Sequence, residues 1–190
     1  MTERSRTTVL AVDDEEAYVD AFARWLGDDY DVRTATKGED AFQQLDEAVD
    51  VILLDRRMPG LSGDQVLSEI RARDIDCQVA MVTAVEPGFD IVEMGFDDYV
   101  VKPVSEEDLV GLVESLLRRA TFDEQFRECF ALASKKAALE ANRDPEELAT
   151  SEEYSELNDR LKDAESRANR TLSELLADGD IDAAYRSIEN

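Results

Sequence analysis

The chain has 190 residues, which is enough for one ordinary domain and a smaller second unit. A hydrophobic content of 43% excludes an intrinsically disordered protein, and no apolar run is long enough to span a membrane. Its 46 acidic and 21 basic residues give a formal net charge of −25, which we interpret as adaptation to a saline cytoplasm; an acidic protein of an ordinary cytoplasm is the alternative.

The first part of the chain alternates short apolar runs with amphipathic stretches. The amphipathic stretches predict helices at residues 15–26, 38–47, 63–73 and 89–94, and a fifth helix begins at Ser105, which Asp108 can help to cap. Gly27 follows the first helix where a left-handed residue is expected. The apolar runs predict strands at residues 7–12, 30–34, 50–54, 78–82 and 99–101. This alternation indicates an α/β fold with a doubly wound, five-stranded parallel sheet.

Beyond Ala120 the pattern is helical only. Either Thr121 and Glu124 cap a new helix, or the helix from Ser105 runs straight on. A break is expected at residues 142–145, before and at a proline. One apolar stripe precedes the break, and it comprises Phe122, Phe126, Cys129, Ala133 and Lys136/Ala137. A second, heptad-like stripe follows it, and it comprises Tyr154, Leu157, Leu161, Ala164, Ala168, Leu172 and Leu175. A final short helix, after Gly179 and capped by Asp180, carries Ile181, Ala184, Tyr185 and Ile188.

The two cysteines and the N-terminus indicate the compartment. Cys77 and Cys129 lie far apart in apolar segments without metal-binding spacing, so we expect buried free thiols. The N-terminal segment has basic residues but lacks the apolar stretch of a secretory signal. We therefore expect a cytoplasmic protein.

Polar side chains follow four of the five predicted strands. Asp13 and Asp14 come after the first strand, Asp55 after the third, Thr83 after the fourth and Lys102 after the fifth. Active residues of parallel sheets gather beyond the carboxyl ends of the strands, so these residues should meet at one edge. Three converging carboxylates repel each other, and a hard divalent cation such as Mg²⁺ relieves that repulsion. A carboxylate held in this way can attack phosphorus and form an aspartyl phosphate.

Each of these residues, taken alone, has an ordinary structural interpretation without a functional role. Acidic residues at the ends of strands are common in a protein with 46 of them, Thr83 alone reads as a strand-end hydroxyl, and Tyr99 alone reads as core. Lys102 is harder to dismiss because it is one of only five lysines and precedes Pro103. The combination, rather than any single member, indicates a phosphoacceptor site.

Four segments carry a resemblance to a known family. VDDEE at residues 12–16, LLDRRMPGLSG at 53–63, VTA at 82–84 and VKP at 101–103 closely resemble the receiver domains of two-component response regulators. The resemblance covers about residues 7–119, and it implies a flavodoxin-like (CheY-like) sheet with strand order 2-1-3-4-5. It further implies that Asp55 is the phosphoacceptor. Asp14 and Asp55 would ligate Mg²⁺ directly, Asp13 through water, and Arg57 through its backbone carbonyl.

The same resemblance assigns the remaining polar residues. Thr83 and Lys102 would contact the phosphoryl group, and Tyr99 matches the switch aromatic three residues before the lysine. The bond between Lys102 and Pro103 is expected to be cis, as in the family. A phosphatase or hydrolase that uses the same aspartate chemistry is disfavoured, because it normally needs an acid/base carboxylate where this chain has Arg57.

The C-terminal part is similar to the HalX domain that follows receivers in halophilic archaea. We therefore expect a receiver at residues 1–120 and a HalX-like helical hairpin at residues 121–190. The resemblance implies a response regulator that takes a phosphoryl group from a sensor histidine kinase and switches a helical output module. It implies no enzyme activity beyond self-catalysed phosphotransfer and dephosphorylation.

The output has several readings. The hairpin could be a simple folded appendage, or it could form a homodimer through its helices; the receiver face made by the fourth helix, fifth strand and fifth helix is a further dimer candidate. A DNA-binding transcriptional regulator is the alternative. Residues 121–190 hold 9 basic and 18 acidic residues, a net of −9, so nucleic acid is disfavoured, although proteins in molar salt can bind DNA with little positive charge.

Overall fold

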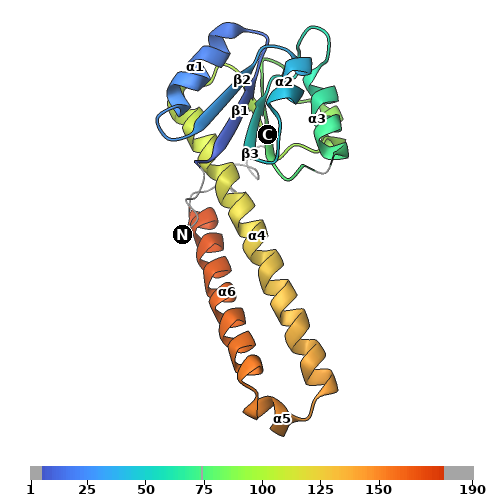
Figure 1. The fold of residues 1–190 in the computed structure, drawn as a ribbon. Coiled ribbons are helices and arrows are strands. Elements are labelled where there is room, and N and C mark those ends of the chain that lie inside the picture. Colours follow the sequence, from blue (N-terminus) through green and yellow to red (C-terminus); the bar gives the residue numbers. More distant parts are fainter. Residues whose placement is uncertain (1–5, 74, 178–190) are drawn as a thin grey trace. The chain divides into compact units, whose positions relative to one another are not determined.

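The structure is a computed structural model that describes residues 6–73 and 75–177 (Figure 1). The chain divides into two compact units, with the division between Leu117 and Arg118. This point lies three residues before the predicted end of the receiver at residue 120. The predicted stop at Gly179 and the final helix that Asp180 would cap lie outside the described residues.

The first unit contains a five-stranded sheet in which every pair of neighbours is parallel. The strand order is β2-β1-β3-β4-β5, which confirms the predicted doubly wound fold. All residues of β1 are buried, as expected for an inner strand that is covered on both faces. The strands are β1 (Thr8–Val12), β2 (Asp31–Ala35), β3 (Val49–Leu54), β4 (Gln78–Thr83) and β5 (Asp98–Val101).

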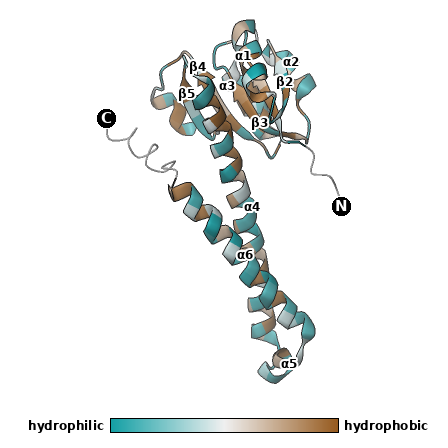
Figure 2. Cartoon of the chain, turned by 90° about the vertical axis from the view of Figure 1, so that its left-hand side faces the viewer, coloured by the Kyte–Doolittle hydropathy of each residue, from teal (hydrophilic) through white to brown (hydrophobic). Residues whose placement is uncertain are grey.

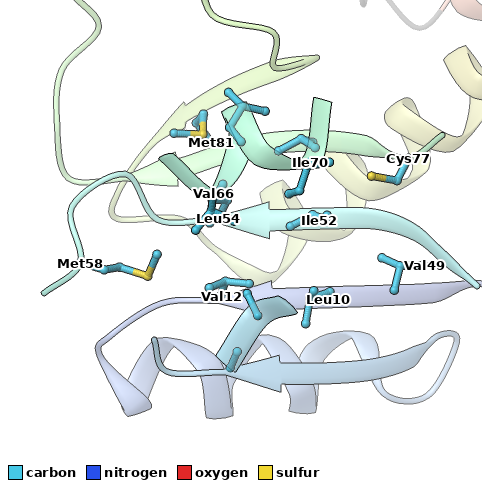
Figure 3. Close-up of a cluster of buried hydrophobic side chains, with 14 residues drawn as sticks. Leu10, Val12, Val49, Ile52, Leu54, Met58, Val66, Ile70, Cys77 and Met81 are labelled. Carbon is cyan, nitrogen blue, oxygen red and sulfur yellow. The ribbon is translucent and has the colours of Figure 1, made fainter. Parts of the chain in front are cut away.

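Helices cover both faces of this sheet (Figure 1). Alternate residues of each strand point to opposite faces, so one strand contributes to two cores. On one face, Leu10, Ile52 and Met81 pack with α2 (Gly38–Gln44) and α3 (Gly63–Ala72), as Figure 3 shows. On the other face, strand residues such as Val9, Val51 and Val82 pack with α1 (Glu16–Leu26) and the first turns of α4 (Glu106–Asn142). Figure 2 shows the strands coloured largely hydrophobic.

Local sequence signals fix the ends of two helices. Ser62 and Gln65 form a reciprocal capping box at the start of α3. Ser105 and Asp108 exchange backbone hydrogen bonds in the same way before α4, as predicted. The prediction for Gly27 was wrong: its φ is −65°, which is right-handed. A side chain is excluded there for another reason, since a Cβ would lie 2.6 Å from the carbonyl oxygen of Ala23.

The predicted short helix at residues 89–94 is a 3₁₀-helix, η1 (Phe89–Glu93). Within the described part of the chain, no helix is both long and apolar enough to cross a bilayer.

The second unit is a helical hairpin. Helix α4 passes through Thr121 without interruption, so the helix from Ser105 does run straight on. The predicted break at residues 142–145 is confirmed, and it is followed by α5 (Pro145–Thr150) and α6 (Glu152–Ala177). Helices α4 and α6 lie side by side and antiparallel (Figure 1). Hydrogen bonds between the two helices include Tyr154 to Glu140 at 2.6 Å, Arg167 to Glu128 at 2.7 Å and Thr171 to Gln125 at 2.9 Å.

The packed face of α4 differs from the predicted stripe. Leu132 is buried against α6, whereas Phe126 and Ala133 are exposed. Gln125 takes a place in the packed face because its side chain accepts a hydrogen bond from Thr171, which is itself buried where Leu172 was expected. The true stripe therefore includes a polar pair that a search for apolar residues overlooks. The hairpin core is small, with Leu132, Leu161 and Ala164 buried and Cys129 and Leu157 packed against them.

Both cysteines are free thiols. Cys77 is buried as predicted, and burial raises the pKa of its thiol to about 11. Cys129 is only half-buried, because it lies at the edge of the hairpin core.

Candidate functional site

The carboxyl ends of the strands bring four predicted residues together. Strands β1 and β3 are neighbours although the chain visits β2 between them, so the order reverses at this pair. Such a switch point opens a crevice beyond the strand ends. Asp13 follows β1, Asp55 follows β3, Thr83 ends β4 and Lys102 follows β5. The side chains of Asp13, Asp55 and Thr83 are all buried.

Lys102 is the centre of this cluster. Its ammonium lies 2.6 Å from Oδ2 of Asp13 and 3.3 Å from Oδ1 of Asp55, and its side chain is only 4% exposed. The same ammonium stands 4.0 Å from the ring centroid of Tyr18, on α1. The buried lysine is thus held by two carboxylates and one aromatic face, which offset the loss of its hydration. The peptide bond between Lys102 and Pro103 is cis.

The electrostatics of the cluster follow from burial and charge. Burial raises the pKa of the Asp13 carboxyl, and this effect outweighs the Lys102 ammonium and the backbone hydrogen bond from Glu15, which lower it. Burial alone would lower the pKa of Lys102, but contacts with Asp13 and Asp55 leave that pKa above its usual value. Lys102 is therefore a firmly charged cation beside the oxygens of Asp55.

Backbone groups orient the two buried carboxylates. The N–H of Arg57 donates to Oδ2 of Asp55 at 2.8 Å, and the N–H of Glu15 donates to Oδ1 of Asp13 at 3.0 Å. Gly63, the first residue of α3, approaches the backbone of Asp55 so closely that any Cβ would clash with its carbonyl oxygen. The loop after β3 is thus folded tightly back on the residue that it presents.

A cavity of about 510 Å³ opens over Asp55. Asp14 is exposed at this cavity rather than packed against the buried pair, which is a departure from the expectation that three carboxylates converge. Among the residues described, no three acidic, thiol or imidazole side chains form a ready metal cage. The physical reason is that the Lys102 ammonium already lies between Asp13 and Asp55. The cavity is lined by Asp14, Glu15, Asp55, Arg57, Thr83, Ala84, Val85 and Lys102.

The donor set nevertheless fits a hard cation. Oδ2 of Asp13 is buried and receives no well-directed hydrogen bond, although the Lys102 ammonium is near it. Asp14 and Asp55 offer carboxylate oxygens to the same cavity, and such oxygens are the ligands that Mg²⁺ prefers. The assignment of Asp14 and Asp55 as direct ligands, Asp13 as a ligand through water and the Arg57 carbonyl as a backbone ligand stays a prediction.

Thr83 and Tyr99 are connected through one residue. Oγ1 of Thr83 accepts a hydrogen bond from the N–H of Val85 at 3.4 Å, and the hydroxyl of Tyr99 donates to the carbonyl of Val85 at 2.8 Å. The Tyr99 ring also packs on Phe96, with centroids 5.5 Å apart. Thr83 and Tyr99 thus contact the same residue, one at its N–H and the other at its carbonyl.

The sequence did not reveal the roles of Tyr18 and Arg56. Tyr18 lies in the first turn of α1, and this place near the start of the helix is the signal that would have put it beside the strand ends. Arg56 pairs with Asp64 at 3.0 Å and also with Asp90 in η1. This second pair ties the loop after β3 to the segment after β4, and no spacing rule predicts it.

The family of the chain follows from comparison with known proteins. Residues 9–114 match the response regulator receiver domain, and residues 118–185 match the HalX domain. The chain belongs to the response regulator receiver family. In this family context the HalX match covers almost all of the helical hairpin, so both of the resemblances stated from the sequence are confirmed.

Several relatives of this receiver protein are regulators by name. A Haloferax volcanii protein that is provisionally named a transcriptional regulator is 50% identical over 196 aligned residues, which cover 94% of this chain and 33% of that protein. The sensory transduction protein RegX3 of Mycobacterium tuberculosis is 36% identical and shares 72% of this chain and 62% of its own length. The chain thus spans between a third and two thirds of the length of these relatives.

Solved receiver domains have the same fold. The receiver domain of a LuxO repressor protein from Vibrio parahaemolyticus superposes with a TM-score of 0.58 at 28% identity, covering 63% of this chain and 96% of that one. The BeF₃-activated DrrB receiver domain superposes with a TM-score of 0.55 at 27% identity, and the match covers 60% of this chain and 98% of that one.

Proposed function

We propose that this response regulator accepts a phosphoryl group on Asp55 from a sensor histidine kinase in the cytoplasm. The observation that carries the proposal is the buried contact of Asp55 with the Lys102 ammonium, 3.3 Å away, at the mouth of a cavity that is open to a phosphoryl donor. A carboxylate fixed beside a cation can act as a nucleophile, because the cation compensates the negative charge that develops on the phosphorylated product. The chain carries out no chemistry other than its own phosphorylation and dephosphorylation.

The residues divide the work of the transfer. One carboxylate oxygen of Asp55 attacks phosphorus, a new O–P bond forms, and the bond to the donor histidine breaks with its electron pair remaining on the imidazole nitrogen. The Arg57 N–H holds Oδ2 of Asp55, so the attacking geometry is set before the donor arrives. Lys102 and the Thr83 hydroxyl then face the transferred oxygens.

A magnesium ion held by Asp14 and Asp55, with Asp13 behind them, would supply the remaining positive charge at the phosphoryl oxygens. BeF₃ activation of the DrrB receiver domain supports a site for a phosphoryl-like group in the family. Radioactive acetyl phosphate offers a direct test. We expect label to enter the protein in millimolar MgCl₂ and to fall at least about tenfold in excess EDTA. Equal labelling in both buffers would contradict a metal-assisted transfer.

The phosphoryl group acts on the rest of the receiver through Thr83. Its oxygens accept a hydrogen bond from the Thr83 hydroxyl and draw Oγ1 toward them, which lengthens the bond that Oγ1 now accepts from the N–H of Val85. Because the carbonyl of Val85 accepts a hydrogen bond from Tyr99, a movement of Val85 biases the position of the Tyr99 ring. Tyr99 is the proposed switch residue, and the output is a change in protein contacts of the helical unit.

DNA is a second candidate for the output, favoured by the names of the relatives from Haloferax volcanii and other organisms. The net charge of −9 at residues 121–190 opposes it, because binding to phosphates needs basic side chains. A gel shift with genomic fragments in molar KCl, with and without phosphorylation, separates the two outputs.

The folded protein should require salt for full stability, because its surface is acidic. With 46 acidic and 21 basic residues, the folded chain repels itself in dilute buffer, and the screening length shortens from about 10 Å at 0.1 M salt to about 3 Å at 1 M. We expect the midpoint of thermal unfolding to rise by about 10 °C between 0.1 M and 2 M KCl. Sucrose at equal osmolality is the control, since it stabilises without screening. A midpoint that does not change in KCl would contradict the adaptation to salt and would favour the alternative, an acidic protein of an ordinary cytoplasm.

A further inference from the structure

Helix α4 has an exposed apolar stripe that its pairing with α6 leaves uncovered. Phe126 and Phe130 are 59% and 69% exposed. Ala133, Ala137 and Ala141 follow on the same side, at steps of three and four residues, and are exposed as well. We call these five residues the outer stripe. Its one acidic neighbour near the C-terminal end, Glu140, is drawn toward α6 by the hydroxyl of Tyr154.

The outer stripe is apolar, although the helical unit around it is rich in acidic residues. Residues 121–190 carry 18 acidic side chains, yet the outer stripe consists of phenyl rings and methyl groups, with the hydroxyl of Ser134 beside its centre. Each exposed phenylalanine forgoes about 1.5–3 kcal/mol that burial would provide. The hairpin core compensates for little of this, because its central cluster contains only Leu132, Leu161 and Ala164 as buried residues.

The order of large and small residues indicates the partner. In an antiparallel pair of two α4 helices with the two-fold axis between residues 133 and 134, position 126 faces 141 and position 130 faces 137. Phe126 of one copy then lies on Ala141 of the other, and Phe130 on Ala137. Every ring meets a methyl-sized hollow, and the contact is the same for both copies, as closed two-fold symmetry requires. A parallel pair would instead place rings against rings.

We infer that the outer stripe of α4 binds the same stripe of a second copy in antiparallel orientation. Four partly exposed rings and the adjoining alanines would bury roughly 1,000 Å² in total, near the lower limit of a specific interface. The contact is therefore weak and reversible, as a controlled output requires. It deepens the proposed function, and it rests on that function only for its control by Asp55.

Sedimentation of the full chain tests the contact. In 2 M KCl, where repulsion between acidic copies is screened, the mass of the unphosphorylated protein should rise from 21.3 kDa toward twice that value at concentrations of about 10–100 µM. Phe126→Glu with Phe130→Glu should weaken association at least about 100-fold. The matched control is Ala131→Glu with Ala138→Glu, which adds the same charges at exposed positions outside the stripe. A monomer throughout, or equal effects of the two pairs of substitutions, would overturn the inference.

Disulfide trapping tests the antiparallel register in a chain carrying Cys129→Ala. Ala133→Cys should link to its own counterpart, since it lies beside the two-fold axis. Phe130→Cys should not link to itself, because seven residues separate positions 130 and 137, about 10 Å along the helix. Linking of both variants to their own counterparts would indicate a parallel pair, and absence of linking at Ala133→Cys would also overturn the proposed register.

The two proposals can fail separately. Phosphoryl labelling of the Phe126→Glu, Phe130→Glu protein should equal that of wild type, because the outer stripe lies outside the Asp55 site. If the wild type takes up no label but still dimerises, the phosphoacceptor proposal fails and the contact stands. If labelling is normal and the wild type stays monomeric, only the contact fails.

Discussion

Replacing Asp55 by asparagine is expected to reduce phosphoryl incorporation from acetyl phosphate at least about 1,000-fold, because the amide cannot act as the nucleophile. The amide keeps the size of the carboxylate and its acceptor oxygen for the N–H of Arg57, so the loop after β3 retains its support. The measurement is radioactive label per mole of protein after incubation in MgCl₂. Far-ultraviolet circular dichroism of the same sample verifies that the variant is folded.

Asp20→Asn is the matched control for this substitution. Asp20 lies exposed on α1 in the same unit, so the change in charge and volume is identical, and labelling should remain at the wild-type level. Equal labelling of wild type and Asp55→Asn would place the phosphoryl group on another residue and would end the assignment of Asp55.

Lys102→Met is expected to lower the free energy of unfolding by about 3 kcal/mol in EDTA. The methionine keeps an apolar stem against Tyr18 but removes the ammonium that now lies between Asp13 and Asp55. Two carboxylates then remain buried without a cation, which is the costly way to break a buried pair. Urea unfolding of both proteins measures the difference.

The loss of unfolding free energy in Lys102→Met should depend on pH in a defined direction. Burial already holds the pKa of Asp13 above its unfolded value, and loss of Lys102 removes an interaction that lowers this pKa. A carboxyl whose pKa is raised by folding favours the folded state below its unfolded pKa, and that contribution disappears as pH rises through the folded pKa. Relative to wild type, the variant should therefore lose the least unfolding free energy at about pH 4 and the most near pH 7.

Lys37→Met is the control, since Lys37 is exposed and its side chain does not cap α2. The free energy of unfolding should change there by less than about 0.5 kcal/mol. If Lys102→Met unfolds at the wild-type urea concentration, Lys102 is not the cation that holds the cluster together.

Much of the sheet was predictable from the sequence because β1, β3 and β4 are short apolar runs whose residues are almost all buried. Residues 50–54 and 78–82 were recognised as strands from these runs alone, and parallel pairing then placed Asp13, Asp55 and Lys102 at one edge. The order in which strands pair came from family resemblance, since apolar runs alone do not encode their neighbours. The left-handed conformation expected at Gly27 failed because close packing against Ala23, not chirality, excludes a side chain there.

The helical part shows where periodicity is insufficient. Helix α4 packs through Leu132 and Gln125, and the polar pair of Gln125 with Thr171 occupies a position that a hydrophobic search assigns to an apolar neighbour. This shifts the packed face by about one residue and leaves Phe126 outside. Similarly, the contact of Lys102 with Tyr18 joins residues far apart in the sequence, and only the folded sheet edge reveals it.

Chemical mapping of the phosphorylated residue tests the central claim most directly. Borohydride reduces an acyl phosphate of aspartate to homoserine, so wild-type protein that is labelled in MgCl₂, reduced and digested can be sequenced by mass spectrometry. We expect homoserine at position 55 and aspartate at positions 13 and 14. Homoserine at another acidic residue, with Asp55 intact, would contradict the phosphoacceptor site described for this sheet edge.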